Sequence, residues 1–208
     1  MASFGENAAR PDDSRSPIAA FALPRQAMIA LSCFTATLAS SLIYDALPPI
    51  MSDLARHFGG GRQGAFLAQL AGTLPLFGVM IGGLMSGPLI ERYGLRLALL
   101  GAMALFGLAG SAGAVLDSAT PFLTARLVMG VAAGLMTTAC TTLVAIFFRG
   151  GRRARMNGFI ISMGSIGGIV FVLIAGWTAI WWWRAPFLLH GAVVLVFLLP
   201  VLLAGAIP

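Results

Sequence analysis

Hydrophobic residues run along this chain in six long stretches that contain almost no charged side chains. The stretches cover residues 27–47, 65–86, 97–116, 122–148, 157–180 and 186–206. A helix needs about 20 apolar residues to cross the hydrocarbon core of a bilayer, and each stretch is at least close to this length. The pattern therefore predicts an all-α integral membrane protein with six transmembrane helices over residues 27–206. The polar composition of residues 1–26 predicts a disordered tail before them.

The polar connections between the stretches are short, which makes neighbouring helices antiparallel. Residues 87–96 connect the second and third spans, 117–121 the third and fourth, and 181–184 the fifth and sixth. Cytoplasmic loops of membrane proteins are enriched in basic residues, and most arginines here lie in the tail, in 87–96 and in 149–155. We therefore expect both termini to be cytoplasmic. Trp181, Trp182 and Trp183 then lie where an aromatic belt would meet the outer membrane surface.

The composition agrees with a membrane protein and argues against several other classes. Hydrophobic residues make up 59% of the 208 positions and charged residues only 10%, with 13 basic and 7 acidic side chains. The basic residues cluster between apolar stretches, as topology signals do, so we expect no nucleic-acid partner. Cys33 and Cys140 lie far apart inside apolar stretches, which favours two buried thiols over a metal site. We expect no cofactor, because no phosphate-binding loop or metal-ligand pattern is present.

Pairs of glycines spaced four residues apart predict close helix packing. Such pairs lie on one helix face, and small residues let helix backbones approach each other in lipid. The pairs are Gly78 with Gly82, Gly130 with Gly134, and Gly164 with Gly168. Pro75 is expected to bend the second span, because it removes one helical hydrogen bond.

Ionisable residues within a transmembrane span are the first candidates for function, because burying a charge in lipid is costly. Arg126 lies about one turn into the fourth span and Asp45 near the end of the first. Arg126 either extends to the membrane surface or provides a fixed charge on a transport path. Asp45 is either an interfacial carboxylate or the partner of that charge. His190, one turn into the sixth span, is more typical of a satisfied buried histidine than of a proton carrier.

A conspicuous polar segment is GPLIERYGLRLAL, at residues 87–99 between the second and third spans. It combines a membrane-edge turn with a carboxylate and two arginines. The residues of interest in this hinge are Gly87, Glu91, Arg92, Gly94 and Arg96.

This hinge resembles the loop motif of the major facilitator superfamily, written G-x-L-x-D-R-x-G-R-R-x-x-L. Glu91 replaces the usual aspartate, and Leu95 replaces one basic residue. The segment LTARLVMGVAAG resembles the family's fourth-helix motif, whose arginine corresponds to Arg126. ALPPI and GWTAIWWWRAPF resemble the end of the first helix and the passage from the fifth to the sixth. In the family's exporters the first-helix segment begins with an aspartate, whose position here is Ala39.

The resemblance implies the amino-terminal half of a major facilitator fold, in which six helices form two inverted three-helix repeats. It implies secondary transport of a small solute by alternating access, coupled to protons or another ion, across a bacterial cytoplasmic membrane. The expected partners are the lipid bilayer, a small-molecule substrate, and either a second six-helix half or a second copy of the chain. Because the sequence ends soon after the sixth span, we expect half or a fragment of a twelve-helix transporter.

Two alternatives to transport remain at this point. The first is an inactive truncated or structural membrane protein that keeps the fold. The second is a rhomboid-like intramembrane serine protease with Ser165 as nucleophile and His190 as base, although GSIGG does not match the usual setting of such a serine. Overall, we expect a protein that is not an enzyme.

Overall fold

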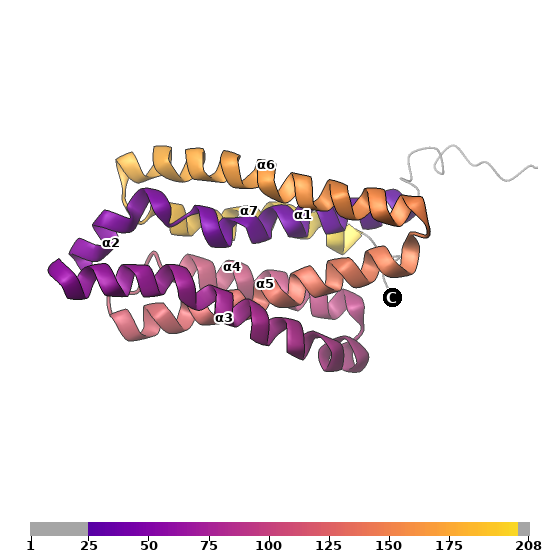
Figure 1. The fold of residues 1–208 in the computed structure, drawn as a ribbon, viewed down its shortest axis with the longest axis horizontal. Coiled ribbons are helices and arrows are strands. Elements are labelled where there is room, and N and C mark those ends of the chain that lie inside the picture. Colours follow the sequence, from indigo (N-terminus) through magenta and orange to yellow (C-terminus); the bar gives the residue numbers. More distant parts are fainter. Residues whose placement is uncertain (1–24, 204–208) are drawn as a thin grey trace, which may run out of the picture.

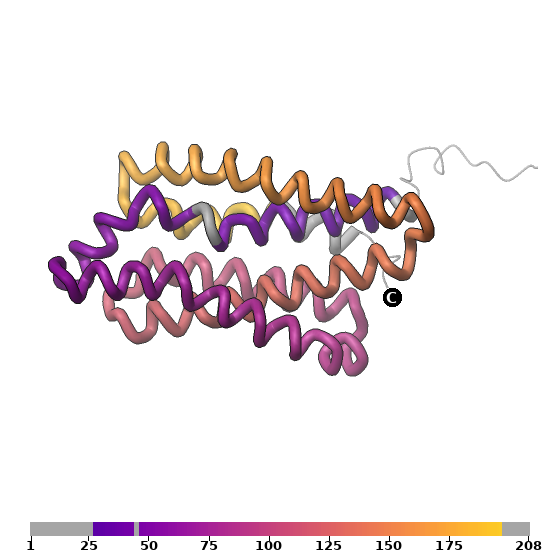
Figure 2. The backbone as a smooth tube through the Cα atoms, viewed as in Figure 1, coloured from indigo at the N-terminus to yellow at the C-terminus, as the bar shows by residue number. Residues whose placement is uncertain are grey.

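A computed structural model describes the backbone of residues 25–203 and the side chains of residues 27–43 and 46–196 (Figure 2). The tail predicted over 1–26 lies almost entirely outside this part. The elements are α1 (Arg25–Asp45), η2 (Pro48–Ile50), α2 (Met51–His57), α3 (Gly61–Tyr93), α4 (Leu95–Ala112), α5 (Ala119–Phe147), α6 (Gly151–Trp181) and α7 (Ala185–Leu203). No strand occurs in this described part. The all-α prediction is therefore confirmed.

Each predicted span corresponds to one long helix. By length and composition, five segments can cross a membrane: the segment from Ala27 to His57, and helices α3, α4, α5 and α6. The sixth, α7, is apolar over Ala185–Val196, where its described side chains end. As the chain pattern predicted, α1 ends just before Pro48 and Pro49, which begin the short helix η2. Helix α2 was not predicted, because its seven residues include polar ones and cannot span a bilayer.

The helices lie side by side in two groups, with α1, α6 and α7 in one and α3, α4 and α5 in the other (Figure 1). Helix α3 packs mainly on α5, and α6 packs mainly on α1. In the same way α4 packs on α5 and α7 on α1, while α4 and α7 also meet each other. The contacts made by α1, α3 and α4 are thus mirrored by α5, α6 and α7. Because α1 and α5 run in opposite directions, this is the arrangement of two inverted three-helix repeats.

The core of the bundle lies around α5. The protein buries 61% of the most apolar 18-residue stretch of α5, but only 17% of the corresponding stretch of α6. The large side chains that α5 buries include Phe122, Met129, Met136 and Leu143. Cys33 and Cys140 are both free and buried, and each thiol faces the other residue's carbonyl oxygen, at 3.7 and 3.9 Å. The protein therefore joins α1 and α5 through a tight, mostly apolar contact.

The crossing of α3 and α5 brings four of the predicted glycines together. A Cβ atom on Gly130 would lie 2.1 Å from the carbonyl oxygen of Pro75, and one on Gly134 would lie 2.3 Å from that of Val79. Gly78 and Gly82 are equally close to the α5 backbone. No side chain fits at these distances, so the two backbones touch. Helix α3 bends near its middle, where Pro75 lies (Figure 2).

The α6 glycines are placed differently. A Cβ on Gly164 would meet Thr37 Cγ2 at an ordinary 3.5 Å, and Gly164 and Gly168 line an open cavity. The close contact of this helix is made instead by their neighbour Gly167, where a Cβ would lie 2.2 Å from Leu38 Cδ1. A spacing of four identifies a helix face but does not say what that face meets.

The turn between the second and third spans is shorter than predicted. We expected a connection over residues 87–96, but α3 continues through Glu91 and Arg92 to Tyr93. Only Gly94 is non-helical, with φ 79° and ψ 158°, a conformation that side-chain-bearing residues rarely adopt. Its N–H still closes α3 by donating to the Ile90 carbonyl at 2.9 Å. Charged residues at a membrane edge can stay helical because water and headgroups solvate them, so charge did not mark the helix end.

Three connections at the other end of the bundle are tied together by Arg184. Its guanidinium forms an ion pair with Asp117, donates to the Ala114 carbonyl at 3.3 Å, and contacts His57 Nε2 at 3.2 Å. It also lies 4.8 Å from the centre of the Trp183 ring. The α4–α5 loop, the α6–α7 loop and the end of α2 are thereby joined.

This Arg184 cluster should show a specific acid dependence. The hydrogen bond and charge of Arg184 lower the pKa of Asp117 from its ordinary value of 3.8. A lowered carboxyl pKa adds stability above the unfolded value and loses it as the pH falls through the folded value. Asp117→Asn should therefore reduce the melting temperature slightly at pH 7, and the difference from wild type should shrink as the pH falls below 3.8. Thermal melts in detergent across this range would test it, and a difference independent of pH would contradict it.

Candidate functional site

Arg126 turns into the bundle instead of reaching the membrane surface. It lies on α5 with only 2% of its surface exposed. Its guanidinium carbon lies 4.9 Å from the centre of the Phe187 ring and 5.5 Å from that of Phe122, and Nη1 contacts Met129 Sδ at 3.8 Å. Within the described residues, Nη2 has no hydrogen-bond partner. Two aromatic rings thus stabilise a buried positive charge that has no carboxylate partner among the described side chains.

His190 lies next to Arg126 on the side of α7. The two are linked through Phe187, whose ring packs on the guanidinium and whose carbonyl oxygen lies 3.1 Å from His190 Nδ1. His190 is fully buried, and its ring packs against Gly110 and Phe106 of α4. Its Nε2 atom has no partner among the described groups. The result is a polar cluster where α4, α5 and α7 meet, with unsatisfied nitrogen atoms on both residues.

Asp45 is the last residue of α1, and its side chain lies outside the described residues. The pairing of Asp45 with Arg126 therefore stays a prediction. Its helix does approach the cluster, because α1 packs on both α5 and α7.

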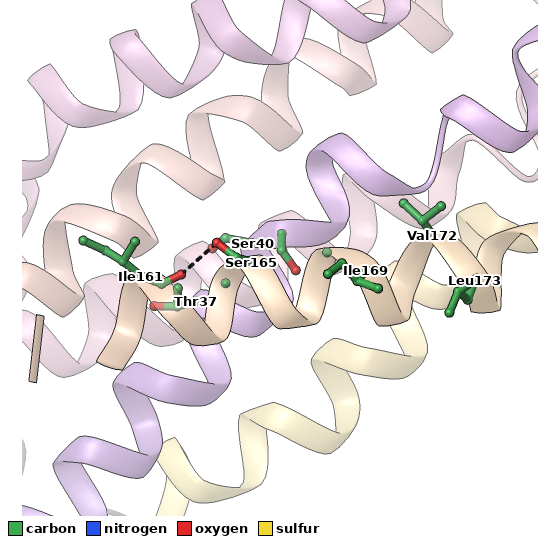
Figure 3. A pocket seen from close by; sticks show the side chains of 10 residues that line it. Thr37, Ser40, Ile161, Ser165, Ile169, Val172 and Leu173 are labelled. Atoms are coloured by element: carbon green, nitrogen blue, oxygen red, sulfur yellow. Dashed lines mark hydrogen bonds between the residues drawn. The ribbon is translucent and has the colours of Figure 1, made fainter. Parts of the chain in front are cut away.

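A second feature is an open cavity of about 660 Å³ between α1 and α6. Its lining consists of Thr37, Ser40, Ser41, Ile161, Gly164, Ser165, Gly168, Ile169, Val172 and Leu173. Figure 3 shows the hydroxyl-bearing residues of α1 facing Ser165 of α6. Sequence reasoning named Ser165 and the two glycines but missed the α1 residues. Their spacing of three and four residues was the available signal, because it places them on one helix face.

The three serine hydroxyls of the cavity use their protons within their own helices. Ser40 donates to the Ala36 carbonyl at 2.9 Å, Ser41 to that of Leu38 at 2.7 Å, and Ser165 to that of Ile161 at 3.3 Å. Their oxygen lone pairs remain available to accept hydrogen bonds from a ligand. Among the residues whose side chains the structure describes, none that lines this cavity is ionisable. It therefore suits a small solute with an apolar body and a hydroxyl or amine donor.

The protease alternative finds no support in this geometry. Ser165 lies at the cavity between α1 and α6, whereas His190 packs against α4 and α5. In the part of the chain that the structure describes, no hydrogen bond joins them, and Ser165 donates to its own helix. A nucleophile and its base need to be within hydrogen-bond reach.

Glu91 and Arg92 lie at the end of α3 and Arg96 lies in the first turn of α4, away from the Arg126 cluster and the cavity. Glu91 and Arg92 are exposed, and the Arg92 guanidinium carbon lies 5.4 Å from the centre of the neighbouring Tyr93 ring. Among the described residues Glu91 forms no ion pair, since the ion pairs found involve Asp53 and Asp117.

Known proteins match this chain over most of its length. It is 31% identical over 188 residues to the 4-hydroxybenzoate transporter PcaK of Pseudomonas aeruginosa, and 28% identical over 187 residues to PcaK of Acinetobacter baylyi. Both alignments cover 85% of this chain, but only 40% and 38% of the respective relatives. The chain thus spans about two-fifths of the length of these curated relatives.

Solved structures share the fold. A crystal structure of a D-xylose–proton symporter matches with a TM-score of 0.73 and 19% identity, covering 86% of this chain and 48% of that protein. The inward-open structure of the xylose transporter XylE from E. coli matches with a TM-score of 0.67 and 21% identity, covering 85% and 47%. The sequence profile of the Major Facilitator Superfamily matches residues 30–207. Fold, relatives and profile agree, and the chain belongs to the major facilitator superfamily.

Proposed function

We propose that this chain takes part in secondary active transport of a small solute across the bacterial cytoplasmic membrane. The observation that carries the proposal is the cavity between α1 and α6, in a chain whose family and curated relatives are transporters. Transport would proceed by alternating access, with these six helices forming one of two halves around a central site. Both termini would be cytoplasmic, because the α3–α4 and α5–α6 connections, with arginine-rich helix ends beside them, lie at one end of the bundle (Figure 1).

The solute would be an aromatic acid or a compound of similar character. The curated relatives are named for 4-hydroxybenzoate, which combines an apolar ring, a hydroxyl donor and a carboxylate. The cavity offers apolar surface and hydrogen-bond acceptors for the first two groups. Arg126 does not line this cavity, but its fixed positive charge within the bundle would attract an anion or stabilise an ionised Asp45 during proton coupling.

The direct test is uptake by the full-length gene product in proteoliposomes. Labelled 4-hydroxybenzoate should accumulate when an inward proton gradient is imposed, and a protonophore should abolish the accumulation. Unchanged uptake in Asp45→Asn would remove Asp45 from the coupling step. Absence of uptake for this compound and for related aromatic acids would contradict the proposed solute class and favour the inactive structural alternative.

Filling the cavity should block solute binding without unfolding the bundle. Ser165→Phe places a ring in the space between α1 and α6, so we expect the KM for uptake to rise about tenfold or more. Ser162→Phe is the matched control, since Ser162 is an exposed residue on the same helix that does not line the cavity. Equal effects of both substitutions would exclude the cavity as the binding site.

The hinge charges, of which Glu91 and Arg92 are exposed and Arg96 is partly buried, would act on the conformational cycle. We propose that Glu91, Arg92 and Arg96 contact the second six-helix half and stabilise one conformation. Gly87 and Gly94 would allow that half to approach. Substituting Glu91 would then alter the transport rate more than the solute affinity.

A further inference from the structure

The α5–α6 connection and the first turns of α6 carry a dense group of positive charges. Arg149, Arg152, Arg153 and Arg155 fall within seven residues and are all exposed. None of them forms an ion pair with any residue that the structure describes. At the opposite end of the bundle, the described acids Asp53 and Asp117 are both paired with arginine. The ion pairs found among the described residues thus lie at one end of the bundle, and this group of arginines lies at the other.

Two of these arginines line a small pocket at the edge of the membrane span. Phe147, Phe148, Arg149 and Arg152 line a space of about 230 Å³, which we call the arginine pocket. The glycine turn at Gly150, with φ 56°, ends α5 and lets α6 begin within this pocket. Aromatic walls and guanidinium groups therefore meet at the level where the apolar part of a span gives way to headgroups.

The chemistry of the pocket matches a phosphodiester. A guanidinium binds phosphate through two parallel N–H donors and stays charged at any physiological pH. The positive end of the α6 dipole adds to the attraction, and the phenylalanine rings can pack against the lipid glycerol and acyl region. We propose that the arginine pocket, together with Arg153 and Arg155, binds the phosphate of an anionic membrane phospholipid. If these arginines served only to set the orientation of the protein in the membrane, they would not need to bind a phospholipid at a saturable site.

Phosphatidylglycerol binding to the purified full chain, measured by native mass spectrometry, would test this proposal. We expect wild-type protein to bind phosphatidylglycerol more tightly than phosphatidylcholine. Replacing the four arginines by glutamine should weaken phosphatidylglycerol binding roughly fivefold for each charge removed. Replacing the same four by lysine should keep the affinity within about fivefold of wild type, because a point charge still binds phosphate.

The matched control changes two arginines at the opposite end, Arg56→Gln with Arg62→Gln. This control should leave phosphatidylglycerol binding unchanged. Equal binding of the two lipids by wild type would overturn the proposal, as would a glutamine variant that binds like wild type. A loss in the lysine or control variant as large as that in the glutamine variant would also overturn it, by showing a general effect on folding. Because the readout is lipid binding, it is independent of whether the solute is transported.

Discussion

Exchanging Gly130 for leucine is expected to prevent the bundle from forming. A Cβ at this position would lie 2.1 Å from the carbonyl oxygen of Pro75, and the obstructing atoms belong to the α3 backbone, which cannot rotate away. The two helices would have to separate along a crossing that also includes Gly78, Gly82 and Gly134. Overpacking of this kind costs about 3 kcal/mol or more. We expect little monodisperse protein after detergent extraction, and a strongly lowered melting temperature in what remains.

Gly101→Leu provides the control for this effect. Gly101 also lies within a transmembrane helix, α4, but it is exposed and a Cβ there would have no neighbour within 4 Å. This substitution should leave the yield and melting temperature close to those of wild type. If Gly130→Leu also behaved like wild type, α3 and α5 would have to cross elsewhere, and the packing described above would be wrong.

Arg126→Met is expected to abolish transport while making the protein more stable. The arginine charge is buried without a described carboxylate, and burying an uncompensated charge is costly. Methionine keeps the volume and the contacts with Phe122 and Phe187 but removes the charge. Replacing buried charged groups by apolar residues of similar size can stabilise a protein by about 1 kcal/mol or more. The melting temperature should therefore rise, whereas uptake in proteoliposomes should fall to background.

Arg126→Lys separates the charge from the shape of the guanidinium. Lysine keeps a positive charge but loses the planar stacking on the two rings and the forked donors, so partial uptake is expected. A lower melting temperature in Arg126→Met would contradict our account. It would mean that an anion already compensates Arg126 in the resting protein. Asp45→Asn would then be expected to lower the melting temperature by a similar amount.

The six spans could be predicted from the sequence because their cause is local. Bilayer thickness sets how many consecutive apolar residues a helix needs, and this requirement is visible at each stretch separately. Short connections then make successive helices antiparallel without reference to any distant contact. The position of Pro48 and Pro49 after the first span follows in the same way, since proline cannot continue a helix.

The helix ends and the faces of the helices were harder to predict. Charge at residues 91 and 92 suggested a turn, yet α3 continues to Tyr93 and ends only at Gly94, where the backbone conformation requires glycine. The glycine pairs of α3, α5 and α6 look alike in sequence. In the structure two pairs meet each other's backbones, and the third lines a cavity.

What the sequence determined by itself is thus the membrane setting, the number of spans and their antiparallel order, and the residues whose chemistry is unusual for that setting. Only the tertiary structure decided that Arg126 turns inward onto Phe187, that His190 lies beside it, and that α1 and α6 enclose a cavity. The physical reason is that lipid constrains every span in the same way, through length and polarity. Which side chains meet depends on helix rotation and crossing, and those are set by contacts between residues far apart in the chain.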